Sequence, residues 1–295
     1  MTNANTRSPG EIRFGYFLVP NADDPLLDTA RRVEQLGLDY VGIQDHPYQR
    51  RFAETWSLMA MIAATTTTLR IFPDVANLPL RQPAVLAKTA ATIDRLSGAR
   101  FELGLGAGAF WDAIEAYGGA RRRPGESLEA LEEAISVIRK VWSGDRDLRF
   151  DGKHYTLAGA HGGPVPAHPI GIWLGAYGPR ALALTGRVAD GWVPSLRGDI
   201  AELAPMVRRL DDAIGAAGRQ PTDVRRIVNV SGRITDGKSE GAFDGPVTRW
   251  VDDLTELVVA YGFDTFLFWG DAERQLERFA TEVVPATRDQ LSPRR

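Results

Sequence analysis

Short apolar runs recur along the chain, and nearly every run is followed by a segment whose apolar residues repeat with helical spacing. Continuous apolar runs are typical of parallel strands that are buried on both faces, and the helical spacing predicts helices that pack one face on such a sheet. Strands are expected at 14–19, 40–43, 69–72, 101–105, 170–174, 191–193, 226–231 and 264–269. Helices are expected at 26–36, 55–66, 83–97, 110–117, 126–142, 180–188, 200–217, 246–261 and 272–280.

The stretch 68–108 shows the repeating unit in its clearest form. A strand leads through a short loop to a helix that begins at Pro83 and stops at Gly98, and a second strand then runs into glycines 104, 106 and 108. Such a strand–helix–strand unit joins parallel strands. About eight of these units in a chain of this length favour a TIM (β/α)8 barrel over an open doubly wound sheet. The first strand also lacks the glycine cluster expected of a doubly wound nucleotide-binding sheet.

The predicted organisation is one α/β barrel domain over 13–285. A disordered lead is expected at 1–12 and a charged tail at 286–295. The segment 148–168 is rich in glycine and proline and interrupts the β/α rhythm, so it is expected to be an insertion with one short strand around 154–156.

Composition narrows the possible chemistry. The chain has 295 residues, a formal net charge of -3, no cysteine and four histidines. Without cysteine, disulfides and a cysteine nucleophile are excluded, and four scattered histidines predict no metal site. The charge gives no reason to expect a nucleic-acid partner. No apolar run is long enough for a bilayer span, and the start of the sequence lacks the apolar core of a signal peptide, so a cytoplasmic protein is expected.

In a TIM barrel the active site is built from the loops that follow the strands. Asp45 and His46 follow the second strand, and a histidine titrates near neutral pH, so it can exchange a proton there. The run GAYGPR at 175–180 precedes a helix, where backbone N–H groups and the helix dipole can hold a phosphate. An ordinary turn and a structural Asp–His pair are the alternatives at these two places.

Several segments together resemble the bacterial luciferase-like superfamily of flavin- and deazaflavin-dependent oxidoreductases. The resemblance rests on YVGIQDH at 40–46, VANLPLRQPAVLAKTAATIDRLSGAR at 75–100, ELGLGAG at 102–108, AYG at 116–118, IWLGAYGPRAL at 172–182 and ADGWVPS at 189–195. It covers residues 12–285 and implies a luciferase-like TIM barrel that binds a flavin-type cofactor in its mouth.

The resemblance also implies roles for particular residues. The GAYGPR run would hold the cofactor phosphate, the segment after Asp74 would pass under the ring, and the bond Asp74–Val75 is expected to be a cis peptide. Asp45 would lie near the ring and His46 near the substrate, with His46 moving a proton and Asp45 orienting it or contacting the ring. The expected cofactor-binding residues are Asp45, Asp74, Val75, Ala76, Asn77, Gly106, Ala107, Gly108, Asp112, Gly175, Ala176, Tyr177, Gly178 and Arg180.

The Asp–His pair resembles the pair found at this place in the branch of the superfamily that uses the deazaflavin coenzyme F420. Ala109 and Asp112 stand where the sugar-phosphate dehydrogenases of that branch have glutamate and asparagine, so a sugar phosphate is not the expected substrate. Aromatic residues near the strand ends instead indicate an apolar or planar substrate, with core packing as their alternative role. The expected substrate-pocket residues are Tyr48, Phe52, Trp56, Phe110, Trp111, Trp192 and Trp269.

The leading hypothesis is therefore F420-dependent hydride transfer to or from a small organic substrate. The alternative is an FMNH2-dependent monooxygenase that uses O2 and a separate reductase, and a third possibility is a non-catalytic flavin-binding protein. The resemblance also implies a homodimer formed by the helices beside strands two and three. Leu58, Met59, Met61 and Ile62 fit that contact, although they can equally pack on the barrel.

Overall fold

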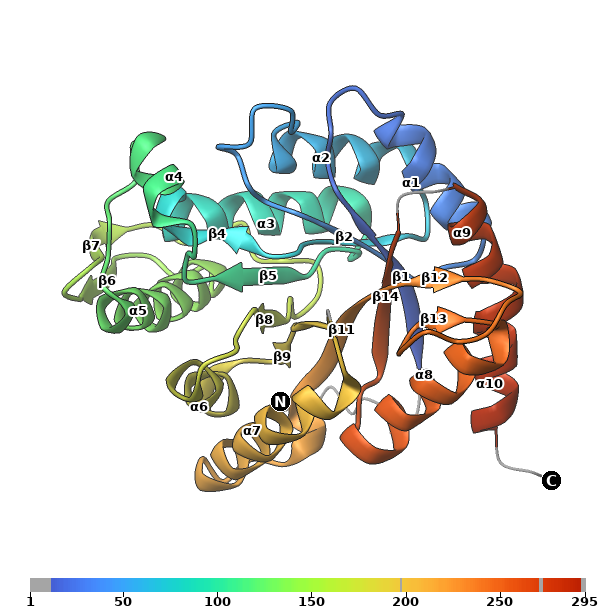
Figure 1. The fold of residues 1–295 in the computed structure, drawn as a ribbon. Coiled ribbons are helices and arrows are strands. Elements are labelled where there is room, and N and C mark those ends of the chain that lie inside the picture. Colours follow the sequence, from blue (N-terminus) through green and yellow to red (C-terminus); the bar gives the residue numbers. More distant parts are fainter. Residues whose placement is uncertain (1–11, 197, 271–272, 293–295) are drawn as a thin grey trace.

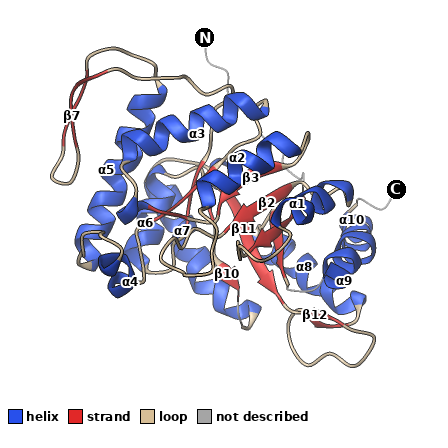
Figure 2. Ribbon diagram, turned by 90° about the horizontal axis from the view of Figure 1, so that it is seen from above, coloured by secondary structure: helices blue, strands red, loops and turns tan. Residues whose placement is uncertain are grey.

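The computed structural model describes residues 12–196, 198–270 and 273–292, and these form a barrel of parallel strands inside a ring of helices (Figures 1 and 2). The barrel strands are β1 (Arg13–Leu18), β2 (Tyr40–Ile43), β3 (Arg70–Pro73), β4 (Ala76–Asn77), β5 (Leu103–Gly106), β8 (Ile172–Leu174), β9 (Gly191–Trp192), β10 (Ser195–Leu196), β11 (Arg225–Ser231) and β14 (Thr265–Trp269). The α-helices are α1 (Leu26–Gln35), α2 (Thr55–Thr65), α3 (Pro83–Ser97), α4 (Trp111–Ala116), α5 (Pro124–Trp142), α6 (Pro179–Val188), α7 (Ala204–Ala216), α8 (Val247–Tyr261), α9 (Glu273–Arg278) and α10 (Val284–Leu291).

The strands follow the order β3-β2-β1-β14-β11-β9-β8-β5-β4, and their pairings are parallel. A parallel bridge between Ile71 and Phe101 links the two ends of this order and closes the ring. β3 and β4 are two parts of one barrel position separated by Asp74 and Val75, and β9 and β10 both pair with β11. Eight barrel positions result, which confirms the predicted TIM barrel.

Proline and glycine set several helix ends. Pro83, Pro124 and Pro179 each occupy the first helical position of their helix, where the missing N–H has no partner to lose. Gly98 ends α3 in a left-handed conformation with φ 73°, which a glycine adopts without steric cost. These residues therefore fix where each helix begins or ends.

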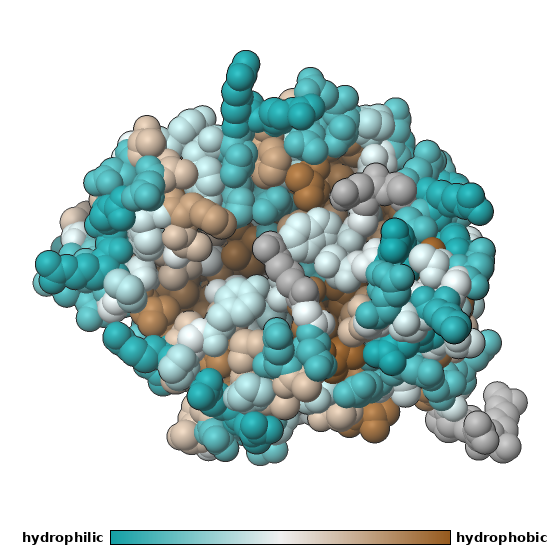
Figure 3. Space-filling view, viewed as in Figure 1, coloured by the Kyte–Doolittle hydropathy of each residue, from teal (hydrophilic) through white to brown (hydrophobic). Residues whose placement is uncertain are grey.

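Two apolar layers stabilise the barrel. The inner layer fills the barrel itself, and its aromatic rings are in contact, with the centroids of Phe72 and Trp173 4.9 Å apart. It consists of Phe17, Tyr40, Phe72, Trp173, Val193, Ile227 and Leu267. The larger outer layer lies between strands and helices, where α5 buries Leu131, Ile135 and Ile138. On the molecular surface, hydrophobic side chains also lie in a hollow near the centre of a largely hydrophilic face (Figure 3).

The insertion differs from the sequence prediction. It contains an antiparallel hairpin of β6 (Leu148–Asp151) and β7 (Thr156–Ala160), so a single strand around 154–156 was wrong. His154 and Tyr155 lie in the turn, where their N–H groups donate to the Glu133 carboxylate of α5. The turn is therefore shaped by a contact with a helix distant in sequence.

The C-terminal end also differs. A π-helical segment, Phe279–Val283, joins α9 to α10, and the helix continues to Leu291, so the tail was predicted to begin too early. Residues 1–11 of the lead expected at 1–12, the first residue of the helix expected at 272–280 and residues 293–295 lie outside the described residues. A further small parallel pair, β12 (Arg233–Ile234) and β13 (Asp244–Gly245), follows β11. Within the described ranges, none of the helices combines the length and apolarity of a bilayer span.

Candidate active site

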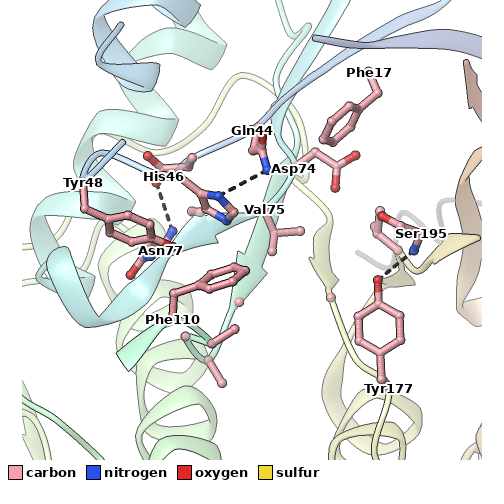
Figure 4. A pocket seen from close by; sticks show the side chains of 18 of the residues that line it. Phe17, Gln44, His46, Tyr48, Asp74, Val75, Asn77, Phe110, Tyr177 and Ser195 are labelled. Carbon is pink, nitrogen blue, oxygen red and sulfur yellow. Dashed lines mark hydrogen bonds between the residues drawn. The ribbon is translucent and has the colours of Figure 1, made fainter. Parts of the chain in front are cut away.

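A cavity of about 320 Å³ opens at the carboxyl ends of the barrel strands, as expected for this fold (Figure 4). It draws residues from seven of the eight barrel positions or the loops that follow them, which brings together side chains that are distant in sequence. It is lined by Phe17, Gln44, Asp45, His46, Tyr48, Asp74, Val75, Ala76, Asn77, Gly106, Ala107, Gly108, Ala109, Phe110, Gly175, Tyr177, Val193, Ser195 and Trp269.

The cavity floor is formed by Val75. The bond Asp74–Val75 is a cis peptide, which confirms the expectation from the resemblance. A Cβ at Gly104 would lie 2.0 Å from the Pro73 carbonyl oxygen and 3.1 Å from Val75 Cγ1, and one at Gly106 would lie 2.8 Å from Val75 Cγ2. The glycines of β5 therefore leave room for the chain's own Val75, a role that the sequence did not reveal.

Asp45 is completely buried, and both oxygens of its carboxylate accept hydrogen bonds. Its Oδ2 accepts from the Asn77 N–H at 3.0 Å and from Arg81 Nε at 2.8 Å, and its Oδ1 accepts from Arg81 Nη2 at 2.7 Å. The Asp45 carboxylate thus ties the end of β4 to Arg81 through a bidentate pair. Within the described residues no hydrogen bond joins Asp45 to His46, so the geometry does not bear out Asp45 as the group that orients His46.

His46 is positioned by Gln44 and by two aromatic rings. Its Nδ1 lies 3.2 Å from Gln44 Nε2, its ring stacks on Tyr48 with centroids 5.3 Å apart, and Phe110 meets it edge-on at 5.3 Å (Figure 4). Burial lowers the pKa of His46, and the nearby Asp45 charge opposes this only in part. His46 is therefore neutral at pH 7 and can accept a proton.

A second polar group lies on the opposite side of Val75. Burial raises the pKa of Asp74 to about 7, against the influence of the Asn229 amide, and Asp74 Oδ2 has no hydrogen-bond partner in the described chain. Asn229 Nδ2 donates to Ser195 Oγ at 3.1 Å, and the Ser195 N–H donates to Tyr177 Oη at 2.8 Å (Figure 4). Asp74 and Ser195 thus form a polar edge of the cavity.

The GAYGPR run contributes only part of its length. Gly175 and Tyr177 line the cavity, whereas Ala176 is buried and its carbonyl accepts from Trp192 Nε1 at 2.8 Å. Gly178 caps α6, and Arg180 lies exposed in the first turn of that helix. These last two are outside the cavity but next to the exposed N–H groups of α6, where a phosphate can bind.

Besides Ala176, Gly178 and Arg180, five of the expected residues do not line the cavity. Asp112 is exposed and paired with Arg121. Of the aromatic residues, Tyr48, Phe110 and Trp269 line the cavity, but the others have different surroundings. Trp192 is fully buried against Phe263, Trp56 lies under Arg81 and against Phe101, Phe52 bridges to Asn21, and Trp111 lies on α4.

The structure adds residues that sequence reasoning missed. Phe17, Gln44, Val193 and Ser195 stand at strand ends, so the rule that located Asp45 could have found them. Ala109 follows the glycine loop and was considered only as a departure from the family pattern. Arg81 and Asn229 gave no such signal, because their importance comes from partners that are distant in sequence.

Comparison with known proteins finds a matching family model and several similar proteins. The model of the family described as luciferase-like monooxygenase matches residues 9–240. An F420-dependent glucose-6-phosphate dehydrogenase of Mycolicibacterium gilvum is 29% identical over 232 residues, which cover 75% of this chain and 68% of that protein. An F420-dependent hydroxymycolic acid dehydrogenase of Mycobacterium tuberculosis is 30% identical over 226 residues, covering 73% of this chain and 61% of that protein.

The fold is shared with a solved structure described as an F420-dependent secondary alcohol dehydrogenase in complex with an F420-acetone adduct. The TM-score is 0.83 at 19% identity, and the match covers 95% of this chain and 100% of that chain. Likeness at this identity concerns the barrel architecture.

Proposed function

Because the chain belongs to the luciferase-like monooxygenase family, we propose that it is an oxidoreductase that uses coenzyme F420 to move a hydride to or from a small, apolar or planar organic substrate. The observation that carries the proposal is the similarity, over about three quarters of the chain, to proteins named F420-dependent dehydrogenases. The residues matched by the family model, 9–240, include the Asp45–His46 pair and the cis bond before Val75, both of which lie at the cavity.

The residues at the cavity fit a flavin-type ring. Gly104, Gly106 and Gly175 pack closely against Val75, so no side chain from these positions covers it. Asp74 Oδ2 is buried without a partner in the described residues, as expected of a group that meets a ligand. When bound, a deazaflavin supplies or accepts a hydride at one ring carbon. Residues from Val75 to Asn77 and from Gly106 to Gly108 would contact the ring, and Gly175, Tyr177 and the start of α6 would hold the phosphate.

His46 would handle the proton that accompanies hydride transfer. Its lowered pKa keeps His46 neutral, so the imidazole can accept a proton from a substrate hydroxyl when a hydride leaves the carbon that bears this hydroxyl. The Gln44 amide can turn either its oxygen or its nitrogen toward Nδ1, so it supports the imidazole before and after the proton moves. This arrangement favours oxidation of an alcohol.

The cavity wall favours an apolar substrate. Tyr48, Phe110, Phe17 and Trp269 supply aromatic surface, and the last two rings are 4.7 Å apart. None of the lining residues in the described chain is Lys or Arg, so a substrate phosphate would have no cation there. Together with Ala109, this argues against a sugar phosphate as substrate.

Cofactor titration tests the proposal. Purified protein is titrated with F420 and with FMN in parallel, and binding is followed by ligand fluorescence. We expect saturable F420 binding and much weaker FMN binding. Tight FMN binding without detectable F420 binding would refute the proposal in favour of an FMNH2-dependent monooxygenase served by a separate reductase.

The variant His46→Gln tests the proton role. We expect it to bind F420 with unchanged affinity and to lose about 10²-fold or more in turnover, since general acid–base groups contribute about that much. Full turnover with cofactor bound would remove His46 from this role. A protein that binds cofactor but exchanges hydride with no alcohol or ketone would instead fit a non-catalytic flavin-binding protein.

A homodimer is a further part of the proposal. Leu58, Met59 and Ile62 of α2 are buried against the barrel, so of the four residues named above only Met61 remains available, and it is 52% exposed. On α3, Val85 and Leu96 are also large exposed apolar side chains. Sedimentation of the wild type and of Met61→Glu would test whether this face forms the contact.

A further inference from the structure

A second cavity lies beside the active-site cavity, where β1 and β14 meet the helices α1 and α9. Its volume is about 480 Å³, and its lining comes from the ends of these two strands, the loop after β1 and the two helices. The helices lie side by side (Figure 1), and Arg32 of α1 is ion-paired with Glu277 of α9 at 2.9 Å. The fold therefore holds a hollow next to the barrel mouth that the proposed function does not yet use.

The two cavities share a wall made of two aromatic rings. Phe17 and Trp269 line both cavities, and their ring centroids are 4.7 Å apart. Phe17 is 4% exposed and belongs to the inner layer of the barrel, whereas Trp269 is only partly buried. Trp269 is therefore the less constrained of the two rings that separate the cavities.

The active-site cavity by itself leaves little room for a substrate. Its volume of about 320 Å³ is near the lower limit of the roughly 300–1,000 Å³ found for cavities that hold one ligand. Under the proposed function, a flavin-type ring and a substrate share this volume. With the ring in place, only the reacting end of a substrate fits beside His46, and the rest has to extend into adjoining space.

The lining of the second cavity favours an apolar or aromatic group. Tyr16 and Phe17 of β1 and Trp269 of β14 supply aromatic rings, and Leu26 and Leu276 add apolar surface from the two helices. Aromatic side chains bury a large apolar area and pack well against a further ring. An aryl group would therefore find both area and ring contacts in this cavity.

The mouth of the second cavity has a negative charge. Asp24, Asp28 and Glu273 line it and are exposed. Among the described lining residues Arg32 is the one cation, and its charge is paired with Glu277. A carboxylate or phosphate on a ligand would meet like charge here, whereas an uncharged or cationic group would not.

We propose that the second cavity holds the far part of the substrate, and that the substrate is an aryl-substituted or similarly apolar alcohol whose far end is uncharged or cationic. Its hydroxyl-bearing carbon lies at His46, and its apolar body passes Trp269 and lies between α1 and α9. The place of the reacting end rests on the proposed function. The cavity and its lining do not depend on the cofactor.

Turnover of phenyl-substituted alcohols tests the proposal. Each buried CH2 group strengthens binding by up to about fourfold, so kcat/KM for phenylbutanol should exceed that for benzyl alcohol by about tenfold or more. Thr29→Phe adds a ring on the α1 side of the second cavity and should lower this ratio about tenfold. The matched control Gln35→Phe adds the same ring at an exposed position of α1 and should keep the wild-type ratio. Equal ratios in all three proteins would overturn the proposal.

Direct binding gives a readout that needs no cofactor. Calorimetric titration of the cofactor-free protein with phenylbutanol should show equal affinity in the wild type and Gln35→Phe, and about tenfold weaker binding in Thr29→Phe. An analogue with a carboxylate on the phenyl ring should bind the wild type about fivefold more weakly than phenylbutanol, and Glu273→Lys should remove most of this difference. If Thr29→Phe does not fold, this comparison decides the proposal, because Glu273 is exposed and its replacement leaves the core intact. Equal affinity of the wild type for both compounds would overturn it.

F420 affinity distinguishes a failure of this proposal from a failure of the proposed function. If F420 does not bind, the proposed function fails, and the calorimetric comparison still decides whether the second cavity takes apolar alcohols. If Thr29→Phe weakens the binding of F420 itself, the second cavity holds part of the cofactor and the proposal is overturned.

Discussion

Replacing Asp45 with asparagine should destabilise the protein far more than its position beside His46 would indicate. Asp45 is fully buried and holds Arg81 through two hydrogen bonds of 2.7 and 2.8 Å, and Arg81 is only 19% exposed. Removing one partner of a buried ion pair costs about 3–5 kcal/mol, because the other charge is left without compensation. Arg81 keeps its contact with Glu54, which is 46% exposed, so we expect the lower end, about 3 kcal/mol.

Chemical denaturation of Asp45→Asn and the wild type measures this loss. For a domain of this size, about 3 kcal/mol corresponds to a fall in Tm of roughly 6–12 °C. The matched control is Glu54→Gln, which removes the exposed partner of the same Arg81 but keeps an oxygen to accept from the Ser57 N–H at the start of α2. An exposed ion pair contributes at most about 1 kcal/mol, so this control should change little.

The double variant sharpens the test. If Asp45 acts through Arg81, combining Asp45→Asn with Arg81→Met should cost less than the sum of the two single changes, with a coupling of about 2 kcal/mol. A loss in Asp45→Asn no greater than in Glu54→Gln would refute the structural role. The alternative would then be that Asp45 acts on the cofactor directly, and F420 affinity should fall in Asp45→Asn without any loss of stability.

Two further predictions concern the lower end of the barrel and the cavity floor. Burial lowers the pKa of His168, but hydrogen bonds and charges of Asp94 and Glu102 outweigh burial and raise the pKa to about 9. The protonated His168 therefore stabilises the folded state fully below about pH 6.5, by up to about 3 kcal/mol. This contribution is lost as the pH rises toward 9. Urea denaturation across pH should show this loss of unfolding free energy in the wild type and in the control His161→Gln, which changes an exposed histidine, but not in His168→Gln. A pH dependence of the unfolding free energy in His168→Gln as steep as in the wild type would contradict the prediction. Gly104→Ala should prevent soluble folding or abolish F420 binding, because its Cβ would lie 2.0 Å from the Pro73 carbonyl oxygen. The control Gly215→Ala, on α7, has open space around its Cβ and should behave as wild type in thermal melts and titrations.

The barrel could be predicted from sequence because its signal is local. Strands buried on both faces leave continuous apolar runs such as 40–43, and Pro83 and Gly98 mark helix ends wherever the chain goes. The hairpin at 148–160 was missed because its turn depends on the Glu133 carboxylate of α5, a contact that no local pattern records.

Within the site, position along the chain was predictable but the direction of side chains was not. The strand-end rule located His46 and Tyr177 at the cavity and also selected Trp192, whose ring turns outward to pack on Phe263. Side chains alternate between the two faces of a strand, so one residue decides whether a ring faces the ligand or the helices. The same limit explains why Asn229 was missed, since its value lies in reaching Ser195 on the neighbouring strand β10.

The charges of the site are arranged so that little net charge remains in the cavity. Asp45 is neutralised by Arg81, burial keeps His46 neutral, and burial raises the pKa of Asp74 to about 7. In such surroundings a developing charge on the substrate is poorly solvated, so a hydride can leave its carbon only if the hydroxyl proton leaves with it. His46 is the neutral base that lies at the aromatic wall where an apolar substrate would rest, while Asp74 lies across Val75, toward Asn229 and Ser195. His46 and Asp74 therefore lie on different sides of Val75, and we propose that His46 is the one that meets the substrate.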